Sequence, residues 1–556
     1  MNNYAAQLNS MTAGMVNFLQ ENGIGHAILS SGSRSAPLAL AFMRNTSIQT
    51  FVVSDERSAA YMALGLAKQM KQRVVLVCTS GTAGLNYAPA LAEACNQQIP
   101  LLVFTADRPS EMIGIGDNQT IFQQHMFAPN IRASFHLNLA KEGFCSPEES
   151  ALVLQNALHL CVWPFPGPVH INVAMSEPLY LLPSEVPDAL TFPKMPPTGD
   201  KINKASPDIR EMAKEVVAFK RIMILAGMHD RHPKLRNILN KLLNMTDMVF
   251  LGDVTSNLND MERGIDHGGV IFSHLSTEEK QFLKPDLLIT FGSFLISKEM
   301  RMYFREAENI VHWHIDPYGE AKDTFFKLKK VLALSPSDFF GALLKNVSAF
   351  RNKTFMSYYK SWRKVEEKAK TYLTEKIKTD ATYGAVMAIL EKIPARSVLH
   401  SGNSLAVRVV NDLSLKVSMH CRSIEVQSNR GTSGIDGCLS TAVGASLTDQ
   451  RIHTVLLGDQ SFVYDRNALW NKYIGDHLKI IVLNNKGGGI FRCMPGTSAQ
   501  EELEEYFVNY VEVDLRKVAE AHHLAYFSCD DQSRLPLVLN RFYRIKGRAA
   551  LLEIHV

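Results

Sequence analysis

The sequence predicts an α/β protein built from three doubly wound parallel-sheet domains. Short apolar runs alternate with helical stretches, which is the pattern of parallel sheets covered by helices on both faces. The chain has 556 residues, enough for about three domains at roughly 100–200 residues each. A proline-rich segment (181–200) and a charged helical stretch (356–378) separate three such blocks. We therefore expect domains over 1–182, 198–350 and 351–556.

The first block begins with an amphipathic helix over residues 1–20 and continues as alternating strands and helices. Helices are predicted over 56–70 and 82–95, where small and apolar residues recur at helical spacing. The predicted buried strands of this block are 26–31, 49–54, 73–80, 100–106 and 166–175.

The two later blocks repeat this pattern. Proline at the density of 181–200 suits a linker and excludes a helix or a central strand. The predicted strands of the second block are 221–227, 248–253, 285–292 and 309–316, and those of the third are 397–403, 453–459, 478–485 and 550–556.

Composition narrows the possible classes of protein. The formal net charge of +4 and the absence of a basic stripe with interleaved aromatics argue against a nucleic-acid partner. No apolar stretch approaches the length of a membrane span, and the N-terminus does not read as a signal peptide. The eight cysteines are scattered without a CxxC, which indicates a reducing cytoplasm and argues against zinc.

The most specific motif lies in the third block. Gly458 and Asp459 end one predicted strand, and Asn484 and Asn485 end the next. In a βαβ unit both ends reach the carboxyl edge of the sheet, where open α/β folds bind ligands. Carboxylate and amide oxygens suit Mg²⁺ or Mn²⁺, and the glycines at 487–489 allow a close backbone approach. The Gly-Asp segment or the Asn-Asn segment alone is usually only a turn or loop. Both together, at this spacing, favour a metal and phosphate site.

This spacing resembles the thiamine-diphosphate binding motif. The resemblance implies that the side chains of Asp459 and Asn485 and the backbone oxygen of Gly487 bind Mg²⁺ (or Mn²⁺), with thiamine diphosphate as the cofactor. The third position of that motif is often glycine, whereas here it is Gln460.

A second part of the resemblance lies in the first block. Glu56 ends a strand and opens a helix rich in alanine and glycine, similar to the pyrimidine-side motif of the same superfamily. The alternative is a structural role, in which the negative charge of Glu56 in the first turn only interacts favourably with the helix dipole. The resemblance implies that Glu56 is the catalytic carboxylate that relays a proton with the cofactor.

Longer motifs in the first and third blocks resemble the menaquinone-pathway synthase family, whose product is 2-succinyl-5-enolpyruvyl-6-hydroxy-3-cyclohexene-1-carboxylate. The motifs are Ser31–Pro37, Thr79–Thr82, Thr105–Pro109, Asp117–Gln119, Gly402–Arg408, Ser428–Gly437 and Gly489–Phe491. The resemblance implies thiamine-diphosphate-dependent decarboxylation of 2-oxoglutarate, followed by conjugate addition of the succinyl-semialdehyde carbanion to isochorismate. It also implies a homodimer or homotetramer with active sites between subunits.

Both substrates are dicarboxylates, which arginine guanidinium groups bind well. By resemblance, 2-oxoglutarate meets Ser404, Arg408 and Arg430. Isochorismate meets Ser33, Arg34, Arg108, Asn118, Gln119 and Lys298, with Ile490 and Phe491 as apolar walls. The cofactor meets Glu56, Ile435, Gly458, Ser461 and Asn485. Some family members carry a second basic residue after the lysine, where this chain has Glu299.

Two other functions stay open at this point. Another thiamine-diphosphate decarboxylase or carboligase for 2-oxo acids should have a more apolar pocket with fewer arginines. A non-catalytic protein of the same fold should have lost Glu56 or a metal ligand, and neither is missing. A nicotinamide dehydrogenase is disfavoured because no strand–GxGxxG–helix fingerprint appears.

Overall fold

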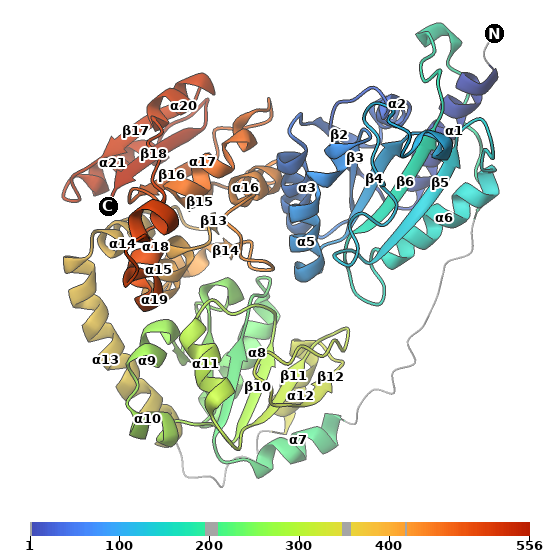
Figure 1. Cartoon of the computed structure of the whole chain (residues 1–556). Helices are drawn as coiled ribbons and strands as arrows, with labels where there is room; N and C mark the ends of the chain where they lie inside the picture. Colours follow the sequence, from blue (N-terminus) through green and yellow to red (C-terminus); the bar gives the residue numbers. More distant parts are fainter. Residues whose placement is uncertain (1–2, 195–208, 347–356, 417–419) are drawn as a thin grey trace. The chain divides into compact units, whose positions relative to one another are not determined.

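The computed structural model describes residues 3–194, 209–346, 357–416 and 420–556 (Figure 1). It contains three six-stranded sheets whose paired strands run parallel. The prediction of three doubly wound α/β layers is therefore confirmed. By compactness the chain forms two units: residues 1–201, 429–450 and 461–478 make the first, and 202–428, 451–460 and 479–556 make the second.

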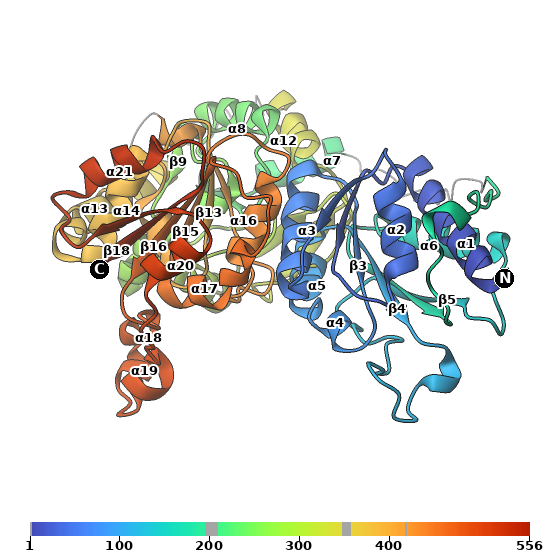
Figure 2. The same cartoon turned by 90° about the horizontal axis from the view of Figure 1, so that it is seen from above.

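The first sheet has the order β2-β1-β3-β4-β6-β5. Its strands are β1 (His26–Leu29), β2 (Gln49–Val52), β3 (Val74–Cys78), β4 (Leu101–Asp107), β5 (Ala133–Leu139) and β6 (Val169–Met175). Helices α1 (Asn3–Glu21), α2 (Ala36–Arg44) and α6 (Pro147–Leu160) pack on one face in a continuous apolar core. Helices α3 (Glu56–Met70) and α5 (Ala88–Gln97) lie side by side away from that core (Figure 2).

The single helix predicted over 82–95 is wrong. The structure has a short helix α4 (Thr82–Leu85) and then α5, separated at Asn86 and Tyr87. Pro89 stands in the first turn of α5, where its missing N–H costs nothing, whereas inside one continuous helix it would remove a hydrogen bond.

The middle sheet has the order β12-β11-β10-β7-β8-β9. Its strands are β7 (Ile222–Ala226), β8 (Val249–Gly252), β9 (Gly264–Ile265), β10 (Leu287–Phe291), β11 (Val311–Ile315) and β12 (Leu328–Leu332). Helices α7 (Ile209–Ala218), α8 (Pro233–Met245) and α12 (Pro336–Lys345) share one apolar core with this sheet. Helices α9 (Gly268–His274), α11 (Lys298–Glu306) and α13 (Ser357–Thr379) belong to another, and α10 (Thr277–Phe282) follows α9.

The third sheet has the order β14-β13-β15-β16-β18-β17. Its strands are β13 (Val398–Ser401), β14 (Glu425–Gln427), β15 (His453–Gly458), β16 (Leu478–Asn484), β17 (Ala525–Cys529) and β18 (Ala550–His555). Helices α14 (Ala381–Lys392), α15 (Leu405–Leu413) and α21 (Leu535–Tyr543) share one apolar cluster with α9, α11 and α13 of the middle layer. The middle and third layers are thus joined by a common core in the second unit.

Shorter elements complete the chain. They are α16 (Cys438–Ser446), α17 (Asp459–Tyr464), α18 (Ile490–Cys493), α19 (Pro495–Ser498), α20 (Leu515–Ala521), the 3₁₀ helices η1 (Ser110–Met112), η2 (Pro183–Glu185), η3 (Val254–Ser256), η5 (Cys421–Ser423) and η6 (Arg466–Leu469), and the π-helix η7 (Leu503–Val508). The described part of the predicted linker, 181–194, contains only η2, and the rest of that linker lies outside the described residues.

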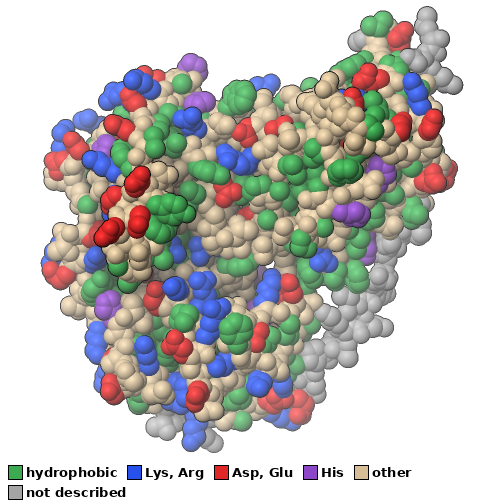
Figure 3. All heavy atoms as spheres, viewed as in Figure 1, with side chains coloured by type: hydrophobic (Ala, Val, Ile, Leu, Met, Phe, Trp, Pro, Cys, Tyr) green, Lys and Arg blue, Asp and Glu red, His purple; other side chains and the backbone are tan. Residues whose placement is uncertain are grey.

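All eight cysteines are free thiols. Within the described ranges, no helix is both long enough and apolar enough to cross a membrane. Lys and Arg side chains are interspersed with Asp and Glu over the face drawn in Figure 3.

Candidate functional site

Three of four neighbouring strands of the first sheet deliver predicted site residues to one edge. Strands β2, β1, β3 and β4 are adjacent and parallel, so their carboxyl ends lie at the same edge of the sheet. Glu56 follows β2, Ser33 and Arg34 follow β1, and Arg108 follows β4. The sheet order therefore gathers residues that are far apart in the chain.

Glu56 is the first residue of α3 and is half-buried. The preceding residue, Asp55, caps the helix by accepting a 2.9 Å hydrogen bond from the Ser58 amide. Burial raises the pKa of Glu56, a backbone hydrogen bond at the helix start lowers it, and the charge of Asp55 raises it further, with a net upward shift. A carboxyl group that retains its proton to higher pH than usual suits a proton-relay role.

Two arginines lie near each other at this edge. Arg34 is only 6 % exposed, donates to the Met175 carbonyl (3.0 Å) and pairs with Glu177 (2.9 Å). Burial lowers the pKa of Arg34, and the nearby positive charge of Arg108 lowers it further.

The terminal nitrogens of Arg108 have no partner among the described residues. Its Nε donates to the Asn118 carbonyl (2.7 Å) and lies 2.9 Å from an Asp117 carboxylate oxygen. Among the described residues, neither Nη atom of Arg108 makes a hydrogen bond. This free edge of the guanidinium is the part that binds a carboxylate bidentately.

The loops that carry these residues pack directly on one another. A Cβ at Gly32 would lie 2.3 Å from the Thr79 Cβ, and one at Gly81 would lie 3.1 Å from the Gln119 carbonyl oxygen. Gln119 has a positive φ of 53°, and the Ser33 hydroxyl hydrogen-bonds to Tyr180 (2.8 Å). The structure thus brings the loops of Ser33, Arg34, Arg108, Asn118 and Gln119 together.

A buried polar chain supports these loops and was missed by the sequence reasoning. Gln123 accepts from the Gly81 amide (2.7 Å) and donates to Asn172 (2.8 Å). Asn172 donates to Asp107 (2.7 Å), whose other oxygen accepts from the Arg108 amide (2.8 Å). Nothing in the local pattern around Gln123 or Asn172 signals this role, because their partners come from other strands.

In the described part of the second unit, two of the predicted metal ligands present buried side-chain oxygens that make no hydrogen bond. Asp459 is 7 % exposed, and its Oδ2 accepts a 2.7 Å hydrogen bond from the Gly487 amide. Within the described chain, Oδ1 of Asp459 and Oδ1 of Asn485 are buried and make no hydrogen bond. Unpaired buried acceptors are costly, and a hard cation would satisfy both. These residues therefore fit a divalent metal ion.

The corner formed by Asp459, Asn485 and the glycines at 487–489 requires glycine because of close contacts. Gly487 has a φ of +105°, and a Cβ there would lie 2.6 Å from the Val508 carbonyl oxygen. A Cβ at Gly489 would lie 2.1 Å from the Asn485 amide nitrogen. The Gly487 carbonyl accepts from the Gly489 amide (2.8 Å), which leaves its second lone pair for a metal.

Gln460, the departure from the usual motif, ties this corner to a neighbouring loop. Its side-chain amide donates to the carbonyls of Val508 (2.7 Å) and Asn509 (3.2 Å). Gly458, which ends β15, leaves open space where a Cβ would stand. Ile490 and Phe491 follow in α18, with the Phe491 ring 5.6 Å from that of Phe507. The described residues contain no group of three or more His, Cys, Asp or Glu side chains that could hold a metal ion.

Helix α15 carries the predicted carboxylate-binding residue Arg408, and the predicted residue Ser404 lies directly before the helix. Ser404 precedes the helix with a φ of +70°, and Arg408 donates to its carbonyl (2.7 Å). Burial lowers the pKa of Arg408, while the charge of Glu299 raises it. Some family members have a basic residue at the position of Glu299. In this chain the negative charge of Glu299 acts on Arg408, and the exposed Lys298 begins α11 beside it.

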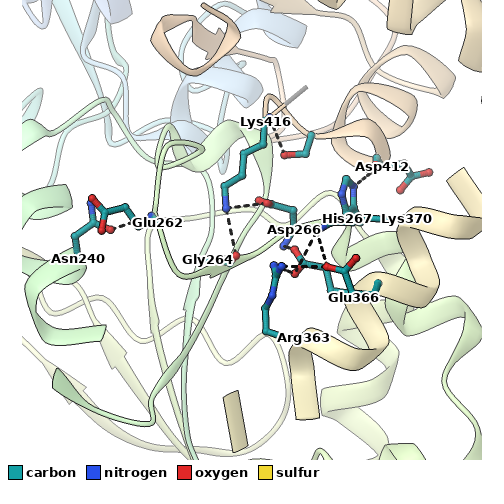
Figure 4. Close-up of polar contacts among 12 residues, drawn as sticks. Asn240, Glu262, Gly264, Asp266, His267, Arg363, Glu366, Lys370, Asp412 and Lys416 are labelled. Carbon is teal, nitrogen blue, oxygen red and sulfur yellow. Dashed lines mark hydrogen bonds and ion pairs between the residues drawn. The ribbon is translucent and has the colours of Figure 1, made fainter. Parts of the chain in front are cut away.

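The opposite end of α15 is held by a polar cluster (Figure 4). Asp412 accepts from the Tyr383 hydroxyl (2.7 Å), and its carbonyl contacts His267 Nδ1 (2.6 Å). Lys416 pairs with Asp266 (2.8 Å), whose amide donates to the buried Glu366 (2.8 Å). Two layers of the second unit thus fix the helix that presents Arg408.

The loop that connects β14 to α16 carries Arg430 and Ile435, in the first unit. The Ile435 carbonyl accepts from the Ser461 hydroxyl (2.7 Å), so the predicted cofactor residue Ser461 supports this loop. Asp436 accepts from the Tyr61 hydroxyl (2.6 Å), and a Cβ at Gly437 would lie 2.2 Å from the Tyr61 ring. Tyr61 belongs to α3, the helix that Glu56 opens.

The chain is similar to known proteins along most of its length. Residues 10–132 match the family described as "Thiamine pyrophosphate enzyme, N-terminal TPP binding domain". A protein of Cytophaga hutchinsonii is 34% identical over 96% of this chain and 94% of its own length. One of Flavobacterium psychrophilum is 37% identical (94% and 91%), and one of Desulfotalea psychrophila is 35% identical (91% and 91%). All three are named 2-succinyl-5-enolpyruvyl-6-hydroxy-3-cyclohexene-1-carboxylate synthase.

Proposed function

Since the chain belongs to the family of 2-succinyl-5-enolpyruvyl-6-hydroxy-3-cyclohexene-1-carboxylate synthases, thiamine-diphosphate enzymes of menaquinone biosynthesis, we propose that it performs this reaction at the residues described above. It decarboxylates 2-oxoglutarate and joins the remaining four-carbon unit to isochorismate by conjugate addition. The family assignment favours this reaction over another 2-oxo acid carboligase and over a non-catalytic role.

Asp459, Asn485 and Gly487 would hold Mg²⁺ (or Mn²⁺), which would neutralise the charge of the cofactor diphosphate. Bound thiamine diphosphate supplies the carbon that adds to the 2-oxo acid and stabilises the negative charge left after CO₂ departs. Glu56 exchanges a proton with the pyrimidine side of the cofactor, and Ile435 packs against it.

The observation that carries the substrate assignment is the pair Arg34 and Arg108. Two guanidinium groups lie close together at the carboxyl edge of the first sheet, and Arg108 has both terminal nitrogens free of partners within the described residues. An anionic acceptor with carboxylates satisfies them, which supports isochorismate there together with Ser33, Asn118, Gln119 and Lys298. Ser404, Arg408 and Arg430 bind the carboxylate of 2-oxoglutarate that remains after decarboxylation.

A coupled assay tests this function. Purified protein should consume isochorismate only when thiamine diphosphate, Mg²⁺ and 2-oxoglutarate are all present. The loss of isochorismate absorbance measures this consumption. Release of CO₂ from 2-oxoglutarate without consumption of isochorismate would leave the cofactor chemistry in place and refute the acceptor. Folded protein with no thiamine-dependent activity on any 2-oxo acid would support a non-catalytic role instead.

The working form is a homodimer or homotetramer in the cytoplasm, where Glu56 of one subunit serves the cofactor held by Asp459 of another. Mixing the inactive variants Glu56→Gln and Asp459→Asn should therefore restore activity. With random exchange, half of the dimers are mixed and one of the two sites in each is intact, so about a quarter of wild-type activity returns. No recovery, despite subunit exchange verified by native mass spectrometry, would place both residues of a site in one chain.

A further inference from the structure

Glu93 is a buried carboxylate that the reaction described above does not use. It lies in α5 and is fully buried at 0 % exposure. Its Oε1 accepts from the Gly431 amide (2.7 Å), and its Oε2 accepts from the Thr432 amide (2.6 Å) and the Thr432 hydroxyl (2.6 Å). The side-chain amide of Gln97, one helical turn further, also donates to Oε1.

These hydrogen bonds act on the two residues directly after Arg430. A Cβ at Gly431 would lie 3.0 Å from both the backbone oxygen and Oε1 of Glu93, so helix α5 contacts the loop backbone itself. Arg430 is 5 % exposed and must leave the loop in one direction to reach a substrate. A carboxylate that holds both following amides fixes that direction.

The 430–437 loop is held at two separate points. Glu93 holds the half that begins with Arg430, whereas Tyr61 and Ser461 hold the half that contains Ile435. The first half contains Arg430, which we assign to the substrate. The second half contains Ile435, which we assign to the cofactor. Substitutions at the two points should therefore affect different ligands.

We propose that Glu93 is a positioning residue that aims Arg430 at the carboxylate of 2-oxoglutarate and so helps to select a dicarboxylic 2-oxo acid. This proposal rests on the function proposed above, in which Arg430 binds that substrate. Glu93 acts through the loop backbone and contacts neither substrate nor cofactor.

The test is Glu93→Gln in the full-length enzyme loaded with thiamine diphosphate and Mg²⁺. Glutamine has one acceptor oxygen and one donor amide in place of the two acceptors, so at least one loop donor loses its partner. We expect the KM for 2-oxoglutarate to rise roughly ten- to a hundredfold, because small displacements of a binding group have effects of this size. The KM for isochorismate and the Kd for thiamine diphosphate should change less than about twofold.

Three comparisons separate positioning from simple structural damage. The preference for 2-oxoglutarate over 2-oxovalerate, which lacks the second carboxylate, should fall in Glu93→Gln and stay unchanged in the exposed control Glu142→Gln. Tyr61→Phe, which loosens the other half of the loop, should weaken thiamine diphosphate binding and leave the KM for 2-oxoglutarate unchanged. Thr432→Val removes one of the three loop hydrogen bonds and should give a smaller effect in the same direction. This variant tests the proposal in place of Glu93→Gln if the latter does not fold.

A double-mutant cycle with Arg430→Lys completes the test. If Glu93 acts through Arg430, adding Glu93→Gln to Arg430→Lys should cause little further loss of kcat/KM for 2-oxoglutarate. Additive losses, or an equal rise in KM for 2-oxoglutarate and 2-oxovalerate, would overturn the positioning role. An Arg430→Lys enzyme with an unchanged KM for 2-oxoglutarate would instead refute the assigned role of Arg430, and the proposal with it.

Discussion

Glu56→Gln is expected to lower kcat for isochorismate consumption by about 10²–10⁴-fold, the range that a positioned acid–base group contributes. Glutamine has nearly the same shape and can still form hydrogen bonds, but it cannot exchange a proton. Steady-state rates with saturating cofactor and both substrates measure the effect. The Kd for thiamine diphosphate, from fluorescence quenching, shows whether the cofactor still binds. Loss of less than about tenfold with bound cofactor would contradict a catalytic role for Glu56.

The same substitution should not lower stability at neutral pH. Burial is the largest cause of the raised pKa of Glu56, so the folded protein binds this proton more tightly than the unfolded chain does. Its contribution to stability therefore decreases as pH rises from about 4.5, the ordinary value, through the higher pKa of the folded state. Glu56→Gln lacks this decrease, so its Tm relative to wild type should rise with pH over that window. The exposed Glu142→Gln should follow wild type throughout.

The central strands could be predicted from the sequence, whereas most edge strands could not. Strands β5, β9, β12, β14 and β17 were not predicted, and each stands at an edge of its sheet. Strands β5, β12 and β17 are only partly buried, so they lack the continuous apolar run of a central strand. Strands β9 and β14 are only two and three residues long. In β5 only Leu137 and Leu139 are fully buried, and β12 contains Lys329 and Lys330. Strand β2 is the exception, because its run Gln49–Val52 continues into the buried Val53.

The candidate site shows the same division. Motifs that end a strand predict Asp459, Asn485 and Glu56 as site residues, because a parallel sheet brings successive strand ends to one edge. Glu93, Gln123 and Asn172 could not be found in this way. Glu93 lies inside α5 and Asn172 inside β6, whereas Gln123 lies in a loop. Each bonds a residue distant in sequence, so only the folded structure reveals its partner.

Asp459→Asn is expected to weaken metal-dependent binding of thiamine diphosphate by about 100-fold or more, equivalent to about 2.7 kcal/mol. The remaining oxygen can still accept from the Gly487 amide, as Oδ2 does now. The new amide group then stands where the unpaired Oδ1 is and presents hydrogens where a cation needs a lone pair. Titration of the cofactor at fixed Mg²⁺ or Mn²⁺ measures the loss, with the exposed Asp530→Asn as control.

Thermal unfolding separates this effect from damage to the fold. At about 100 times Kd, cofactor and metal should stabilise the wild type by roughly 2.7 kcal/mol, and a chelator should remove the gain. At the same concentrations Asp459→Asn should gain about 0.4 kcal/mol or less, yet its unliganded Tm should not fall at neutral pH. Burial is the main cause of the raised pKa of Asp459, so a neutral amide avoids the cost of burying a charge.

Gly489→Ala tests the same corner without changing any proposed ligand. The added Cβ would lie 2.1 Å from the Asn485 amide nitrogen, so Asn485 must move and carry its Oδ1 out of place. If Asn485 binds the metal, this variant should lose metal-dependent cofactor binding as Asp459→Asn does. Normal binding in Gly489→Ala with a defect in Asp459→Asn would remove Asn485 from the ligand set and keep Asp459. Normal binding in both would place the metal elsewhere, because the two buried oxygens would then have no cation to satisfy them.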